Sequence, residues 1–470
     1  MSSTTPANAS DELTYGVELE FLYAYIRAEG PEEKPDPWTQ VKPERKKLLR
    51  ERNLSQPPVY YFPTARTILF MESGDIVPDE PIAKLVQGTL ESVGCRAHLT
   101  SVCGMTPTRG TGRQHTWWQK DWAVKQDNSV EKDDAAGFGF ASVEVNTPIL
   151  SALDPSSYEK VELAVNTLKQ QHRLSINSTC GLHVHVGLGQ AEIPLLTVQK
   201  LATILWFGQD FIANLVQPER RHSDYGEAGI WTLSSLSQRP FAEPDASVEY
   251  HTWMGDVLGG VIPTSTHLAS ALSAADRYMK DIWDMDSLRD LTLFKNVFTA
   301  ERLGFDFSRL VWGSNIANQA RSPTFEVRVL EGTLNARTIT AWSKLWAGLL
   351  QFAHNSNVEL FRDFLRKLVR DYLDCGYNHS RYYRGTEMVD ERKSVKSTGR
   401  FLTELAGVSS VFTLEAAEHL KMKMGLVHFQ CCDHSDSLPF NGDPSDSAVD
   451  LGLFGTLGDI VPSRCPIHDA

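Results

Sequence analysis

The chain has few cysteines, no long apolar run and no sign of a secretory leader. Seven cysteines in 470 residues are few, and an odd number fits reduced thiols better than a disulfide framework. The lack of any run of about 18 apolar residues argues against a membrane span. The opening MSSTTPANASDE has neither the basic start nor the apolar core of a secretory signal. We therefore expect a cytoplasmic protein that has no membrane partner.

An excess of positive charge is also missing. The chain carries 46 Lys and Arg against 59 Asp and Glu, a formal net charge of −13. A nucleic-acid surface needs a dominant basic patch, so this balance argues against a nucleic-acid partner. It remains compatible with a local basic pocket that binds phosphate groups.

What the chain does contain is a succession of strand and helix patterns in an ordinary globular composition, 41% hydrophobic and 22% charged. Several strand patterns are short and polar on one side. They fit an α+β domain with a mostly antiparallel sheet better than a doubly wound parallel sheet. We expect a disordered lead over residues 1–11, a single domain over 12–425 with insertions at about 28–58 and 217–260, and a loosely packed tail over 426–470.

Local signals place the individual elements of this domain. Asp154 and Asn335 are suited to cap helices, Pro155 to a first helical turn and Gly94 to a helix end. Strands are predicted at 14–26, 96–102, 122–130, 139–150, 180–187 and 324–333, and helices at 81–94, 154–174, 192–215, 335–355 and 357–373.

The strand pattern CGLHVHVG, residues 180–187, carries two imidazoles on one face. Alternate residues of a strand share a face, so His183 and His185 point one way and the apolar residues between them point the other. Three more strand patterns divide in the same way. Their polar pairs are Glu18 and Glu20 in GVELEFL, Glu144 and Asn146 in SVEVNTP, and Glu326 and Arg328 in FEVRVL.

If these strands share one sheet, one surface collects carboxylates, imidazoles and a guanidinium. Crowded carboxylates repel one another, and a divalent cation such as Mg²⁺ or Mn²⁺ removes that cost. Arg328 beside such a site is suited to a phosphate, so the pattern predicts a metal–ATP site for phosphoryl transfer. The alternative is that each polar residue is simply solvated on a half-exposed strand.

The order of these motifs resembles the putative amidoligase family, carboxylate–amine ligases related to glutamine synthetase and glutamate–cysteine ligase. GVELEF, a strand ending VEVNTPIL, CGLHVHVG, and a Glu-Val-Arg strand followed by Gly-Thr-Leu carry the resemblance, from about Tyr15 to about Trp346. It implies a glutamine synthetase-like curved, mostly antiparallel sheet, with helices on its convex side and metal and ATP on its concave face.

The resemblance also implies roles for single residues. The metal ligands would be Glu18, Glu20, Glu144, His183 and Glu326. The nucleotide would meet His185, Arg328 and Asn315, of which Asn315 resembles a motif asparagine that touches the substrate. Catalysis would depend on Glu326, Arg328 and His185. The sequence departs from the family pattern at Leu330, where members often have His, and at Asn335, where they often have Asp.

The implied activity is that of an ADP-forming ligase that joins a small-molecule or peptide carboxylate to an amine. A free carboxylate does not react usefully with an amine, so such ligases first convert it to an acyl phosphate with ATP, assisted by Mg²⁺ or Mn²⁺. Three alternatives stay open: a phosphotransferase on the same site, a metal-dependent hydrolase, and a catalytically inactive binding protein.

A few further residues carry a second interpretation. Cys180 is a weak candidate nucleophile, and packing at the strand start is the simpler reading. Asp127 either lines the charged face or sits in a turn, and Trp342 and Trp346 fit the core. Weak zinc motifs occur at 431–434 and 465–468. Arg220 and Arg221 either reach a substrate carboxylate or end a helix in solvent.

Overall fold

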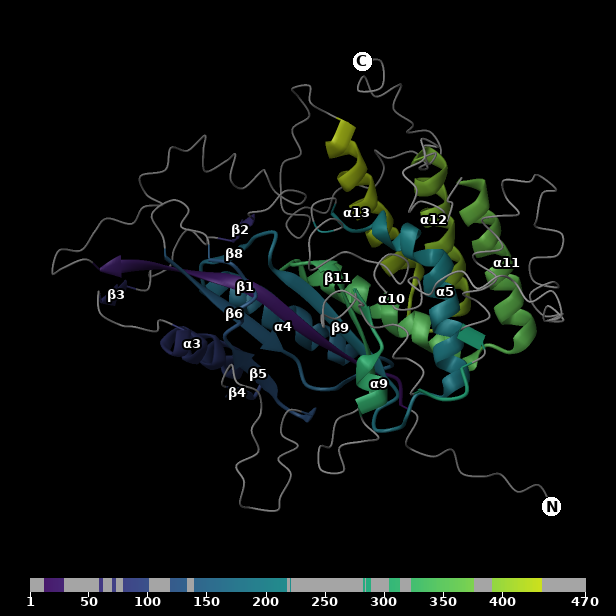
Figure 1. The fold of residues 1–470 in the computed structure, drawn as a ribbon. Coiled ribbons are helices and arrows are strands. Elements are labelled where there is room, and N and C mark those ends of the chain that lie inside the picture. Colours follow the sequence, from purple (N-terminus) through teal and green to yellow (C-terminus); the bar gives the residue numbers. More distant parts are fainter. Residues whose placement is uncertain are drawn as a thin grey trace, which may run out of the picture.

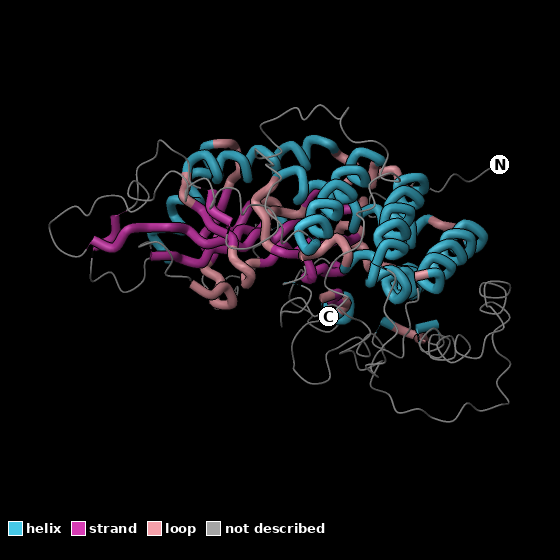
Figure 2. Tube along the Cα trace, turned by 90° about the horizontal axis from the view of Figure 1, so that it is seen from above, coloured by secondary structure: helices cyan, strands magenta, loops and turns pink. Residues whose placement is uncertain are grey.

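A mixed β-sheet forms the centre of the protein, and helices cover one of its faces and extend beyond one end (Figures 1 and 2). This arrangement confirms the α+β class, whereas the glutamine synthetase-like form of the sheet stays a prediction. The computed structural model describes residues 12–28, 59–61, 70–72, 79–100, 119–132, 139–217, 220, 282–283, 285–288, 304–312, 323–375 and 391–432.

The described strands form an 11-stranded sheet whose main path is β10-β11-β9-β1-β6-β5-β4, and β2, β3, β7 and β8 join it off this path. All ladders are antiparallel except β1 with β3 and β4 with β5, so the predicted mostly antiparallel pairing is confirmed. The strands are β1 (Thr14–Ala28), β2 (Val59–Tyr61), β3 (Phe70–Glu72), β4 (Ala97–Leu99), β5 (Trp122–Lys125), β6 (Gly139–Asn146), β7 (Leu150–Ser151), β8 (Leu174–Ile176), β9 (Gly181–Gly187), β10 (Phe305–Asp306) and β11 (Thr324–Glu331).

Three of the described helices begin at a capping side chain. Asp154 and Asn335 accept hydrogen bonds from the first turns of their helices, and Asn357 does the same for the helix after it. Two helices after residue 390 have no counterpart among the sequence predictions. The helices are α3 (Asp79–Ser92), α4 (Pro155–Gln171), α5 (Leu195–Ala213), α9 (Ser308–Trp312), α10 (Ala336–Asn355), α11 (Val358–Asp374), α12 (Glu391–Val408) and α13 (Leu414–Cys432).

The core lies between the apolar face of the sheet and α10. Val17 on β1, Val184 on β9 and Val327 on β11 are all fully buried, as the two-residue alternation requires. Trp342 and Trp346 of α10 are also buried, with their ring centroids 6.4 Å apart, which confirms that they are core residues. Figure 1 shows α4 and α10 behind the sheet and the short α9 in front of it.

Some predicted boundaries fall elsewhere. The strand predicted at 122–130 ends at Lys125, because Asp127 turns the chain by accepting a hydrogen bond from the Ser129 amide. The predicted helix 192–215 begins only at Leu195, after Pro194. Most of both predicted insertions lies outside the described residues. α13 continues to Cys432, past the predicted start of the tail.

Candidate active site

The register of the strands places the predicted polar residues next to one another on one face of the sheet. On β1, Glu18 is paired with His183 of β9 on one side, and Glu20 is paired with Glu144 of β6 on the other. On the far side of β9, His185 is paired with Glu326 of β11. Directly paired residues project from the same face of a sheet, so all these side chains converge on the face opposite α10.

A β-bulge displaces the end of β11. Between the pairs Val327–Val184 and Leu330–Leu182, two residues of β11 oppose His183 alone, and Arg328 is one of them. The Arg328 guanidinium nevertheless contacts Glu326 and lies 3.4 Å from His183 Nδ1. The bulge therefore positions Arg328 beside the charged face rather than in a regular ladder.

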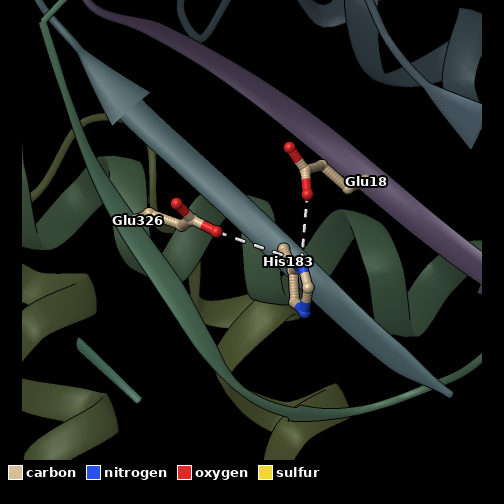
Figure 3. A group of neighbouring side chains, drawn as sticks. All are labelled: Glu18, His183 and Glu326. Atoms are coloured by element: carbon tan, nitrogen blue, oxygen red, sulfur yellow. Dashed lines mark hydrogen bonds and ion pairs between the residues drawn. The ribbon is translucent and has the colours of Figure 1, made fainter. Parts of the chain in front are cut away.

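The first group of candidate ligands is Glu18, His183 and Glu326, from three neighbouring strands (Figure 3). His183 Nδ1 lies 3.0 Å from Glu18 Oε2 and 4.0 Å from Glu326 Oε1. His185 Nε2 is 3.0 Å from the other Glu18 oxygen. Burial lowers the pKa of His183, as does the nearby Arg328, so its imidazole is neutral at pH 7 as a metal ligand must be.

Two guanidiniums neutralise the first group. Arg328 forms a very short contact with Glu326 Oε1, and Arg309 Nε lies 3.0 Å from Glu326 Oε2. Burial alone would raise the pKa of Glu326, but His185 and the two arginines hold it well below its usual range. Arg309 Nη2 also lies 3.7 Å from Glu18 Oε1, so this side chain spans two strands.

Arg309 reaches the site from α9, a helix of five residues. β10 precedes α9, and its Asp306 is paired with Glu326 in the ladder and accepts a hydrogen bond from the Ser308 amide. The pairing of β10 with β11 at the edge of the sheet thus places α9 next to the charged face. Sequence reasoning missed Arg309 because so short a helix has no apolar period.

The second group is Glu20, Asp127 and Glu144. Burial raises the pKa of Glu144 to about 8, with a further contribution from Glu18, although Lys125 Nζ lies 2.8 Å from its Oε1. Burial, together with the charges of Asp127 and Glu144, also raises the pKa of Glu20. Asp127, which the sequence left undecided, thus joins the charged face.

Gly181 lies next to Glu20 at one end of the second group. Its amide donates a 2.6 Å hydrogen bond to Glu20 Oε2. A side chain here would meet Arg220 Nη2, His183 Nε2 and Glu20 Oε2 at 2.8, 2.9 and 3.1 Å. Arg220 is only 3% exposed, so it does not end a helix in solvent. Arg221 lies outside the described residues.

The donor sets fit a hard divalent cation. Mg²⁺–oxygen distances of about 2.1 Å place neighbouring ligands roughly 3.0 Å apart and opposite ligands roughly 4.2 Å apart. The 3.0 and 4.0 Å distances from His183 to the two glutamates lie within that range. In the second group, three carboxylates lie beside one ammonium, and burial together with neighbouring carboxylates raises the pKa of Glu20 and Glu144.

The structure therefore gathers all but one of the predicted site residues. It divides Glu18 and Glu20 between two groups and adds Asp127, Lys125 and Arg309. Asn315 and the motif at 465–468 lie outside the described residues. Burial raises the pKa of Cys180 to about 12, so its thiol stays protonated and is a poor nucleophile.

The two departures from the family pattern occupy structural positions. Leu330 is fully buried opposite Leu182, within the core. Asn335 caps α10 through a 3.1 Å hydrogen bond from the Thr338 amide. Neither position lies among the candidate metal ligands.

Comparison with known proteins supports the resemblance over part of the chain. Residues 78–228 match the model of a family described as "putative amidoligase enzyme", which indicates a ligase. The matched range holds Asp127 in the turn after β5, Glu144 of β6 and both histidines of β9, whereas Glu18 and Glu326 lie outside it. No curated protein matches the chain. None of the described helices combines the length and apolar character that crossing a bilayer would take.

Proposed function

We propose that the protein is an ATP-dependent carboxylate–amine ligase that forms an amide or peptide-like bond through an acyl phosphate. The observation that carries this proposal is the convergence of two groups of candidate metal ligands and two arginines on one face of the sheet. A metal-dependent hydrolase of an uncharged amide or ester would leave these guanidiniums without an anion to bind. A triphosphate supplies the negative charge that they would bind.

The chain's own residues would act mainly by positioning. Glu18, His183 and Glu326 would hold one divalent cation, and Glu20, Asp127 and Glu144 another. Bound Mg²⁺ or Mn²⁺ would supply charge neutralisation at the phosphate oxygens. Arg328 would contact the transferring phosphoryl group, and His185 would line the nucleotide.

The test measures ADP release by the full chain with Mg²⁺ and ATP, using pools of carboxylates and amines. We expect release that requires both co-substrates, together with a new amide product. Glu326→Ala should abolish both while the protein stays folded by circular dichroism. ADP release without an amine would indicate a phosphotransferase, and ATP-independent turnover a hydrolase. Full amide formation by Glu326→Ala would overturn the assignment of that residue.

A further inference from the structure

The two groups of candidate ligands differ in their balance of charge. In the first group, the carboxylates of Glu18 and Glu326 face the guanidiniums of Arg309 and Arg328, so negative and positive charges are equal. Glu326 is fully buried, and each of its oxygens already contacts an arginine. The first group is therefore electrically satisfied before any metal arrives.

The second group is not satisfied in this way. Glu20, Asp127 and Glu144 face Lys125, which pairs with Glu144. In the described part of the chain, Lys125 with Glu144 is the contact that joins these three carboxylates to a lysine or arginine. A divalent cation can therefore enter the second group without displacing a guanidinium, whereas at the first group it meets carboxylates that two arginines already contact.

Arg309 contacts the first group and is more accessible than the other charged residues there. Its side chain is 37% exposed, against 13% for Glu18 and 25% for Arg328. It extends from a short helix in front of the sheet rather than from the ladder itself (Figure 1). Arg309 can therefore leave the carboxylates without disturbing a strand, whereas Arg328 belongs to β11.

We propose that Arg309 is the resident counter-cation of the first group, and that a divalent cation takes its place only together with a triphosphate. The phosphates supply the negative charge that lets the first group accept a cation, and they receive the released Arg309 guanidinium. The second group binds its cation without nucleotide. This inference rests on the proposed function and assigns Arg309 as a positioning residue that orders metal and nucleotide binding.

The test counts Mn²⁺ bound to the full chain by electron paramagnetic resonance, with and without a non-hydrolysable ATP analogue. For the wild-type protein we expect one tightly bound Mn²⁺ without the analogue and two with it. Arg309→Ala should bind two Mn²⁺ without the analogue, the second at least about tenfold more tightly than the wild-type protein does, because a like charge is removed. The same variant should bind the analogue more weakly. Arg309→Lys keeps the charge and should resemble wild type.

Arg96→Ala is the matched control, because Arg96 pairs with Asp121 near the far edge strand β4 at 2.6 Å. It should leave Mn²⁺ binding unchanged. Two Mn²⁺ ions bound by wild type without the analogue, with no effect of Arg309→Ala, would overturn this inference and leave the proposed function standing. Absence of Mn²⁺ binding under both conditions would overturn both.

Discussion

The amide of Gly181 donates a hydrogen bond to Glu20 Oε2 at 2.6 Å, which joins the start of β9 to a carboxylate of the central strand. The same glycine leaves room for three functional side chains, since an added Cβ would lie within 3.1 Å of Arg220, His183 and Glu20. Each of these contacts is with the far end of a flexible side chain. A methyl group at Gly181 would displace the candidate ligands more readily than it would unfold the protein.

Gly181→Ala should therefore weaken Mn²⁺ binding by about tenfold or more, with a loss of stability of about 1 kcal/mol, the lower end of the cost of overpacking. Isothermal titration and urea denaturation measure the two quantities. Gly88→Ala is the control, because nothing lies near that position of α3 and alanine favours a helix by about 1 kcal/mol. Unchanged metal binding in Gly181→Ala would contradict the placement of Glu20 and His183 at the site.

Glu144 should make the metal-free protein less stable as pH rises. Its pKa is about 8 in the folded protein against 4.5 ordinarily, so between these values the folded state keeps a proton that the unfolded state has lost. The free energy of unfolding then falls with rising pH, by at most about 1.4 kcal/mol per pH unit for this one group. Urea denaturation in EDTA at pH 5, 6, 7 and 8 measures this slope.

Glu144→Gln removes the titrating group and should flatten that dependence. Adding Mn²⁺ should flatten it in the wild-type protein as well, because the cation stabilises the ionised carboxylates. A slope that is the same in both proteins would show that Glu144 ionises normally.

We expect Asn335 to contribute to the stability of the fold rather than to catalysis. Its side chain caps α10, so Asn335→Ala should cost about 1 kcal/mol of stability. Asn335→Asp keeps the acceptor and should leave both stability and ligase activity close to wild type. Thermal denaturation and amide formation are the two measurements. A large gain of activity in Asn335→Asp would place this residue in the site instead.

Alternation along single strands predicted which side chains share a face, because a two-residue period follows from the backbone alone. It did not predict which strands are neighbours. The separation of Glu18 from Glu20 depends on β9 lying on one side of β1 and β6 on the other, which is a matter of sheet order. The bulge at Arg328 also escaped prediction, although the alternation breaks beside it, where Val329 is followed directly by Leu330.

The helices were predicted where caps and apolar periods coincide, as at Asp154 and Asn335. α13 was missed because apolar and polar residues are mixed around its circumference, which gives no single stripe to detect. Arg309 depends on a short helix and a two-residue strand, both below the length at which a pattern can be recognised.

Glu18 and Glu20 lie on one continuous strand, and this determines how far apart the backbones of these two candidate ligands are. Residues two apart on a strand are separated by roughly 6.6 Å. The backbone of β1 therefore acts as a spacer that assigns two carboxylates of one strand to two separate groups of candidate ligands, each of which would hold its own cation.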